Sequence, residues 1–199
     1  MTIWILSDLH LFHENMYKFV YTDRFGVERR VRERFKDAAE GDAYMLDRWR
    51  TLVKPSDHLY NLGDVTLNRG NHMIHAFIGI HQSLPGHKRL ILGNHDHYAV
   101  KVYSDAGYQK IKASNVIDGL LLTHYPVHPS SISAKFHACV HGHIHQNQSP
   151  PGRYLNMSVE NTDYEPVPLE VVKDRAKKLY DIWKETKEAE QMLRMKESI

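Results

Sequence analysis

The chain has 199 residues, of which 42% are hydrophobic and 25% charged, and its formal net charge is +2. These values predict one folded domain with a buried core and exclude a wholly disordered chain. The small net charge gives no argument for nucleic-acid binding by itself. Fifteen histidines in a chain of this size point instead to metal binding or acid–base chemistry.

The only cysteine, Cys139, cannot form an internal disulfide, which favours a reducing compartment. Its apolar neighbours predict a buried core thiol rather than a nucleophile. Strand-like sequence follows Met1 directly without a signal-peptide pattern, and no apolar run approaches the roughly 20 residues that cross a bilayer. We therefore expect a cytoplasmic protein that does not associate with membranes.

The first half of the chain predicts strands that each end on polar residues, with helices between them. The strands are expected at residues 2–6, 58–62 and 88–92. The helices are expected at residues 14–19, 39–53 and 74–83.

Strands crowd into the second half of the chain. They are expected at residues 108–111, 116–117, 120–122, 138–141 and 154–159. A helical piece up to about residue 106 precedes them, and a short helix is expected at residues 130–136. This alternation of strands and helices predicts a layered α/β domain.

Residues 21–36 interrupt the pattern. A turn between two short extended pieces is expected around residues 22–27. Five basic residues follow it: Arg29, Arg30, Arg32, Arg34 and Lys36. The segment is either a solvated hairpin or a flap that faces the substrate, and its charge would suit a nucleic-acid backbone.

From Leu169 onward, apolar residues recur in alternating three- and four-residue steps, which predicts a helix to Glu197 that is roughly 40 Å long. We expect a domain at residues 1–165 and a helical tail at residues 166–199. The tail either packs on its own domain, or it protrudes or forms a homodimer with a second copy.

The polar residues after the strands form one set of candidate metal ligands. In chain order they are Asp8, His10, Asp64, Asn94, His124, His143 and His145. Carboxylate, imidazole and amide ligands without thiolates suit Mn²⁺, Fe²⁺ or Zn²⁺. Seven ligands exceed the needs of one ion, whereas two ions about 3.5–4 Å apart with a bridging carboxylate would use them all.

The order of these motifs resembles that of the calcineurin-like metallophosphoesterase superfamily over about residues 1–160, and most closely its small capless bacterial and phage members. The motifs are Asp8-x-His10, Gly63-Asp64, Gly93-Asn94-His95-Asp96, His124 and Gly142-His143-x-His145. The resemblance implies an α/β fold, a four-layer α/β/β/α sandwich of two mixed sheets flanked by helices, to which this chain adds a long C-terminal helix.

The resemblance also implies the grouping of the ligands. Asp8, His10 and His145 would bind one ion, Asn94, His124 and His143 the other, and Asp64 would bridge the two. The activity that it implies is that of a dinuclear-metal-dependent phosphoesterase, a hydrolase of phosphoric esters, in which a metal-bridging hydroxide attacks phosphorus.

His95 is the candidate general acid for the leaving alkoxide. Asp96 either orients the His95 ring, raises its pKa or caps a helix. We favour a small phosphate ester, a phosphodiester or a nucleotide as substrate and Mn²⁺ as the metal. A phosphomonoesterase, a phosphoprotein phosphatase and a non-catalytic metal-binding scaffold are the alternatives.

Two features depart from the family pattern. Many members read Gly-Asp-x-x-Asp at the second motif, but here the last position is Leu67. The missing carboxylate would affect fine positioning rather than metal binding. His141 adds an imidazole before Gly142, and we expect it to support a ligand or the fold rather than to bind metal.

Overall fold

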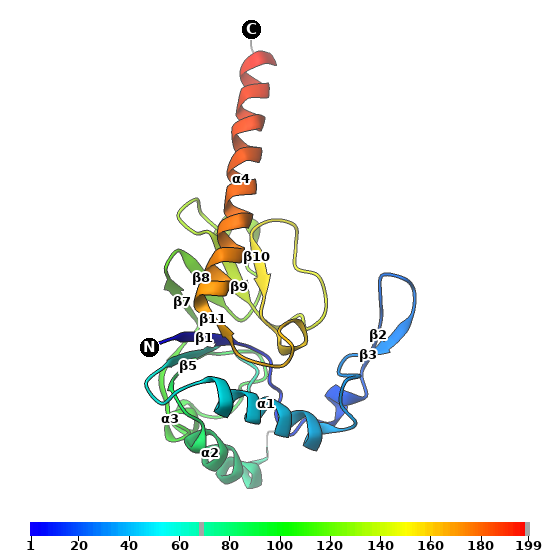
Figure 1. The fold of residues 1–199 in the computed structure, drawn as a ribbon, viewed down its shortest axis with the longest axis vertical. Helices are drawn as coiled ribbons and strands as arrows, with labels where there is room; N and C mark the ends of the chain where they lie inside the picture. The colour runs from blue at the N-terminus through cyan, green and yellow to red at the C-terminus, as the bar shows by residue number, and fades with distance from the viewer. Residues whose placement is uncertain (68–69, 198–199) are drawn as a thin grey trace.

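Two mixed β-sheets form the centre of the protein in a computed structural model that describes residues 1–67 and 70–197 (Figure 1). The strand orders are β11-β1-β4-β5-β6 and β10-β9-β8-β7. The first sheet comprises β1 (Ile3–Leu6), β4 (His58–Asn61), β5 (His87–Ile91), β6 (Tyr108–Lys112) and β11 (Val167–Pro168). The second comprises β7 (Ser114–Ile117), β8 (Leu120–Thr123), β9 (Ala138–His141) and β10 (Tyr154–Asn156).

Parallel pairing brings the site-forming ends of the strands together. β1, β4 and β5 run parallel to one another, and so do β8 and β9. β11 and β7 pair antiparallel with β1 and β8, which makes both sheets mixed. The carboxyl ends of the parallel strands therefore lie at one edge of each sheet, where loops can meet.

Side chains along the first sheet point alternately to its two faces, and each face contributes to a different core. Leu6, Leu59 and Leu90 pack against a helical layer. That layer consists of α1 (Ala38–Leu52), α2 (Ile74–Ser83) and α3 (Val100–Asp105) (Figure 1). Ile5 and Ile91 belong to the other core, which the second sheet completes. The predicted pair of mixed sheets flanked by helices is thus confirmed.

The outer face of the second sheet is covered by the segment between β8 and β9. Ile132 packs there against Cys139 and Tyr154. A 3-10 turn, η3 (Pro129–Ser131), replaces the helix expected at residues 130–136. The reason lies in Arg153, whose guanidinium binds the carbonyls of residues 132, 133 and 136 and so takes acceptors that a helix would use. This outermost layer is therefore irregular.

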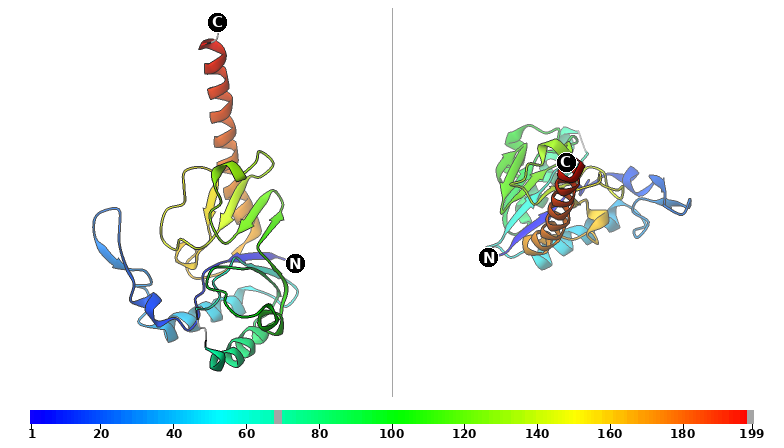
Figure 2. Two further views of the ribbon diagram at one scale, coloured as in Figure 1. Left: turned by 180° about the vertical axis from the view of Figure 1, so that it is seen from behind. Right: turned by 90° about the horizontal axis from the view of Figure 1, so that it is seen from above.

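Short elements surround the site. They are η1 (Glu14–Tyr17), η2 (Asn71–Met73), η4 (Val159–Asn161) and the strands β2 (Val20–Thr22) and β3 (Glu28–Arg30). β2 and β3 form a hairpin that projects from the side of the body (Figures 1 and 2). The strand expected at residues 154–159 ends at Asn156, because Ser158 turns inward and its hydroxyl donates to Asp8.

The C-terminal helix α4 (Leu169–Glu197) starts inside the sandwich and then leaves it (Figure 2). Leu169, Val172 and Ala176 lie in the core between the sheets. The boundary expected at residue 165 therefore precedes a strand and a helical segment that belong to the body. Farther along, Trp183 stacks on Arg153 at 3.9 Å, and Leu193 is 60% exposed. Dimerisation through α4 stays a prediction.

None of the described helices combines the length and the apolar character needed to span a bilayer.

The two ends of α4 should respond differently to truncation of a leucine. Leu169 is 2% exposed, so Leu169→Ala should lower the free energy of unfolding by about 2–5 kcal/mol. Leu193→Ala removes an exposed side chain and should change it by less than about 0.5 kcal/mol. Urea denaturation of the two variants measures both values, and equal losses would contradict a separate, protruding end.

Candidate metal centre

The loops at the carboxyl ends of the strands bring the seven predicted ligands to one place. The first sheet supplies Asp8, His10, Asp64 and Asn94, and the second supplies His124, His143 and His145. Donor atoms of Asp8, His10 and His145 lie within 4.8 Å of one another, and so do those of Asp64, His124 and His143. The described chain thus contains two candidate metal sites.

Asp64 lies between the two groups. Its Oδ2 is 3.5 Å from His10 Nε2 and 3.3 Å from His124 Nε2. Burial alone would raise the pKa of Asp64, but its hydrogen bond and charge interactions with His124 and the nearby His10 hold that pKa at about 2. An ionised carboxylate in this position can contact cations in both groups.

The donor atoms around His124 fit a cation. His124 Nδ1 lies 2.8 Å from the carbonyl oxygen of Leu62, so it is the nitrogen that carries the proton. In the neutral ring the lone pair of Nε2 faces Asn94 Oδ1 at 2.9 Å and Asp64 Oδ2 at 3.3 Å. Burial alone would lower the pKa of His124, but its contacts with Asp64 and Asp8 raise it, so a proton on Nε2 takes the place of a cation in the metal-free protein. Three lone-pair atoms at these distances repel one another unless a proton or a metal ion lies among them. Asn94 thereby joins the group of Asp64, His124 and His143.

The first group also fits a cation. Both ring nitrogens of His10 are buried and have no hydrogen-bond partner among the described residues. Burial lowers the pKa of His10 well below its usual value, so the ring is neutral at pH 7. His10 Nε2 lies 3.9 Å from Asp8 Oδ1. A neutral imidazole beside a carboxylate is the form that binds Mn²⁺, Fe²⁺ or Zn²⁺.

Backbone strain marks the same residues. Five of the seven predicted ligands adopt left-handed φ angles between 48° and 73°: Asp8, His10, Asp64, His143 and His145. Each such residue costs of order 1–3 kcal/mol, and strain of this kind clusters at functional sites. Sequence patterns carry no signal for it, because none of these residues is glycine.

Three motif glycines make room for the ligands. A Cβ at Gly93 would lie 2.2 Å from Asp64 Oδ1, and a Cβ at Gly142 would lie 2.2 Å from Asp8 Oδ2. Neither residue has a left-handed φ, so close approach to a carboxylate, rather than a sharp turn, excludes a side chain there. At Gly63 both reasons apply: its φ of 107° disfavours other residues, and a Cβ there would also contact His124.

Asp96 supports Asp64 rather than His95. Its buried carboxylate accepts hydrogen bonds from the backbone amides of Gly93, Asp64 and Val65. Burial raises the pKa of Asp96 to about 6. The expected roles of orienting the His95 ring or capping a helix are therefore corrected, since the carboxylate is taken up by backbone amides and α3 begins only at Val100.

The two remaining histidines of the motifs differ in what they can do. His95 donates its backbone amide to Asp64 Oδ1, and its ring centroid lies 5.4 Å from that of His10. Its Nδ1 is buried, and no residue of the described ranges forms a hydrogen bond with it. His141 is fully buried, and its ring nitrogens bond the Gly142 carbonyl and the Ser149 hydroxyl. His141 therefore supports the loop and has no nitrogen left for a metal.

Sequence reasoning missed a buried ion pair behind the first group. Glu160 Oε2 lies 3.2 Å from His145 Nδ1, and Glu160 Oε1 accepts from Arg32 at 2.9 Å. Burial alone would raise the pKa of Glu160, but Arg32 and His145 lower it to about 2. Arg32 also donates to the carbonyls of Asp8 and Leu9. The pair fixes the His145 tautomer and the first ligand loop together.

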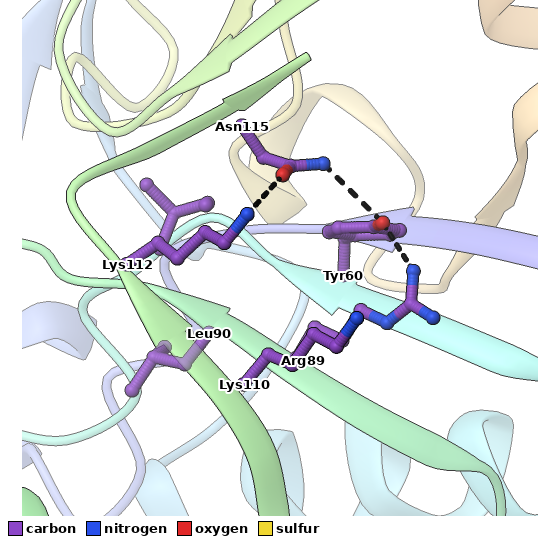
Figure 3. Close-up of a pocket in the computed structure, with 7 residues that line it drawn as sticks. Tyr60, Arg89, Leu90, Lys110, Lys112 and Asn115 are labelled. Atoms are coloured by element: carbon purple, nitrogen blue, oxygen red, sulfur yellow. Dashed lines mark hydrogen bonds between the residues drawn. The ribbon is translucent and has the colours of Figure 1, made fainter. Parts of the chain in front are cut away.

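A pocket between β5, β6 and β7 lies apart from the metal centre and is lined by none of the seven ligands (Figure 3). The Arg89 guanidinium lies 4.9 Å from the Tyr60 ring centroid and donates to its hydroxyl. Asn115 links that hydroxyl to Lys112. The cavity of about 40 Å³ has room for a few waters and not for a phosphate ester. The metal centre is therefore the better candidate for the functional site.

Strain at the ligands can be measured in the metal-free protein. His143 has φ of 73°, so His143→Gly should leave a free energy of unfolding about 1 kcal/mol higher than His143→Ala. Both variants lack the imidazole, which makes the comparison independent of metal binding. At Ile144, which is not left-handed, the glycine variant should be the less stable one. Denaturation with a chelator present measures the free energy of unfolding of all four variants. If glycine is more stable than alanine at both positions, or less stable at both, the backbone strain at His143 is contradicted.

The role of Glu160 predicts a change in metal affinity. Glu160→Gln removes the charge that His145 and Arg32 share, so affinity for Mn²⁺ should fall 10–100-fold at one of two sites. Calorimetric titration of the metal-free protein measures this. Glu165→Gln is the matched control, because Glu165 pairs with Arg48 and contacts no ligand. Equal affinities in the two variants would refute the role.

Comparisons with known proteins give relatives in an archaeon and in phages. At 27% identity over 180 residues, the chain is similar to the uncharacterized protein MJ1445 of Methanocaldococcus jannaschii, covering 85% of this chain and 88% of that protein. It is 34% identical over 93 residues to the Gene 66 protein of Mycobacterium phage L5, covering 47% of this chain and 39% of the phage protein.

A solved structure shares the fold. It is the protein of unknown function AQ665 from Aquifex aeolicus, with a TM-score of 0.65 and 25% identity over 87% of this chain and 98% of the other. A family model for calcineurin-like phosphoesterases matches residues 1–194, nearly the whole chain. The chain therefore belongs to the calcineurin-like phosphoesterases, metal-dependent hydrolases that act on phosphoric esters.

Proposed function

We propose that the protein is a dinuclear phosphoesterase that hydrolyses phosphodiesters or nucleotides, with Mn²⁺ as the favoured metal and His95 as general acid. The observation that carries the proposal is the position of Asp64 between two ligand groups, within 3.5 Å of a histidine from each. When bound, two divalent ions would neutralise phosphoryl oxygens and acidify a water. The protein's own residues would hold these ions and supply the proton for the leaving group.

The position of His95 beside the first ligand group supports a role as proton donor. Its amide is fixed on Asp64, and its ring lines a pocket together with His10 and His145 of the first ligand group. Because Nδ1 is buried, Nε2 is the nitrogen that would deliver a proton to the leaving-group oxygen. Proton delivery matters most when the leaving alcohol is a weak acid.

The charge of the pocket supports a diester over a monoester. Among the described residues that line it, none is lysine or arginine. A monoester dianion brings one more negative charge than a diester, and nothing in this lining beyond the histidines and the bound metals would balance it.

His95→Ala should keep both metals and lose about 10²–10⁴-fold in kcat on a diester with an alkyl leaving group. It should lose less on bis(p-nitrophenyl) phosphate, whose leaving group needs no proton. His75→Ala, in α2, is the control. Equal losses on the two substrates would argue against the acid role.

Metal dependence decides between an enzyme and a scaffold. Chelated protein should have no turnover and regain it as about two equivalents of Mn²⁺ are added, and Asp64→Ala should remain inactive at any metal concentration. A matrix of metals against monoesters, linear diesters, cyclic nucleotides and single-stranded nucleic acid identifies the preferred class. Metal binding without turnover on all of these would favour the scaffold, and preference for monoesters would favour a phosphatase.

A further inference from the structure

A pocket of about 320 Å³ opens beside the first ligand group. His10, His95 and His145 line the side nearest the chemistry. The lining also contains four apolar residues: Met16, Phe19, Val31 and Leu67. Its size falls in the range of sites that hold small organic ligands. A phosphate ester bound at the metal centre would therefore have a space of this size next to it.

Two of these apolar residues, Phe19 and Val31, lie at the base of the hairpin. The Val31 amide donates to the Phe19 carbonyl at 2.8 Å, which holds the two residues together. Phe19 is 49% exposed and its ring stands edge-on to His13, with centroids 5.9 Å apart. A half-exposed phenyl ring beside a ligand cluster offers a face on which a flat ring can stack.

Leu67 is another of the four apolar lining residues. It occupies the position where many family members carry the second carboxylate of the Gly-Asp-x-x-Asp motif, and it lines the pocket instead. This replacement removes a negative charge from the wall. Among the described lining residues there is neither a carboxylate nor a lysine or arginine, so apart from its histidines the wall offers no charged group to a ligand.

The lining also offers amide groups. Gln146 and Asn147 line the pocket next to His145. Gln146 Oε1 is buried and has no hydrogen-bond partner in the described chain, so the amide gains one when it turns toward a ligand in the pocket. A plain phenyl ring cannot supply a hydrogen-bond partner for Gln146, because it has no polar edge. A nucleobase has a flat face for Phe19 and an edge of N–H and C=O groups for an amide.

We infer that this pocket binds the nucleobase of the substrate, which makes a nucleoside phosphate ester the substrate class. The inference rests on the proposed function, because it assumes that the phosphate lies at the metal centre. Phe19 and Gln146 are then specificity residues: Phe19 stacks on the base, and Gln146 bonds its edge.

The test compares adenosine 5′-monophosphate with ribose 5-phosphate as inhibitors of bis(p-nitrophenyl) phosphate hydrolysis with Mn²⁺. The base should tighten inhibition about tenfold or more. Phe19→Ala should abolish this ratio, whereas Phe25→Ala, at the hairpin tip with 74% exposure, should keep it. Gln146→Met should reduce the ratio and Gln148→Met should not. Equal inhibition by the two compounds, or equal effects of the Phe19 and Phe25 variants, would overturn the inference.

A second measurement separates this inference from the proposed function. Adenosine and ribose are titrated into the metal-free protein and followed by NMR, which needs neither metal nor turnover. Shifts at residues 19, 31 and 146 with adenosine, and not with ribose, support the pocket even if no ester is hydrolysed. Turnover of the generic diester without any adenosine response would leave the proposed function standing and refute the nucleobase site.

Discussion

The crowding of lone pairs around the Asp64 carboxylate is the constraint that shapes the rest of the site. Imidazole nitrogens of His10 and His124 approach it to 3.5 and 3.3 Å, and the His95 amide donates to it. A carboxylate so enclosed stays ionised only while donors or cations surround it. The absence of a Cβ at Gly93 and the three amides that hold Asp96 follow from the same need for space and fixed geometry.

This arrangement is costly for the metal-free chain, since strained backbone and unpaired buried nitrogens both oppose folding. Two features offset the cost. The loops are cross-linked by backbone hydrogen bonds, such as those from Asp8 to Gly63 and from His10 to Asp64. Metal binding to the folded state alone adds further stability, which grows with the ratio of metal concentration to its dissociation constant. Stability and function are therefore coupled at the same atoms.

The sequence was sufficient where local order carries the information. Strand periodicity and the polar residue after each strand predict the strands, and the family resemblance that the motif order carries implies the two sheets and the two ligand groups. It was insufficient where partners are distant: Arg32 and Glu160 are 128 residues apart, and nothing distinguishes Arg32 from the exposed arginines of its segment. The sequence predicts Asp96 in the correct loop but assigns it to the His95 ring, whereas its carboxylate binds backbone amides of the Asp64 loop. That partner depends on how two loops pack together, which local sequence does not reveal.

The basic segment at residues 29–36 takes on a different meaning in the fold. Arg29 and Arg34 pair with Asp23 and Asp163 at the surface, where such pairs contribute about 0–1 kcal/mol and leave the side chains free to rearrange. Arg32 is fully buried and holds the carbonyls of the first ligand loop. Its neighbour Val31 lines the pocket beside the first ligand group. One arginine thus ties the hairpin base to the metal ligands, so the pocket wall and the metal centre keep a fixed relation while the hairpin tip remains free to vary.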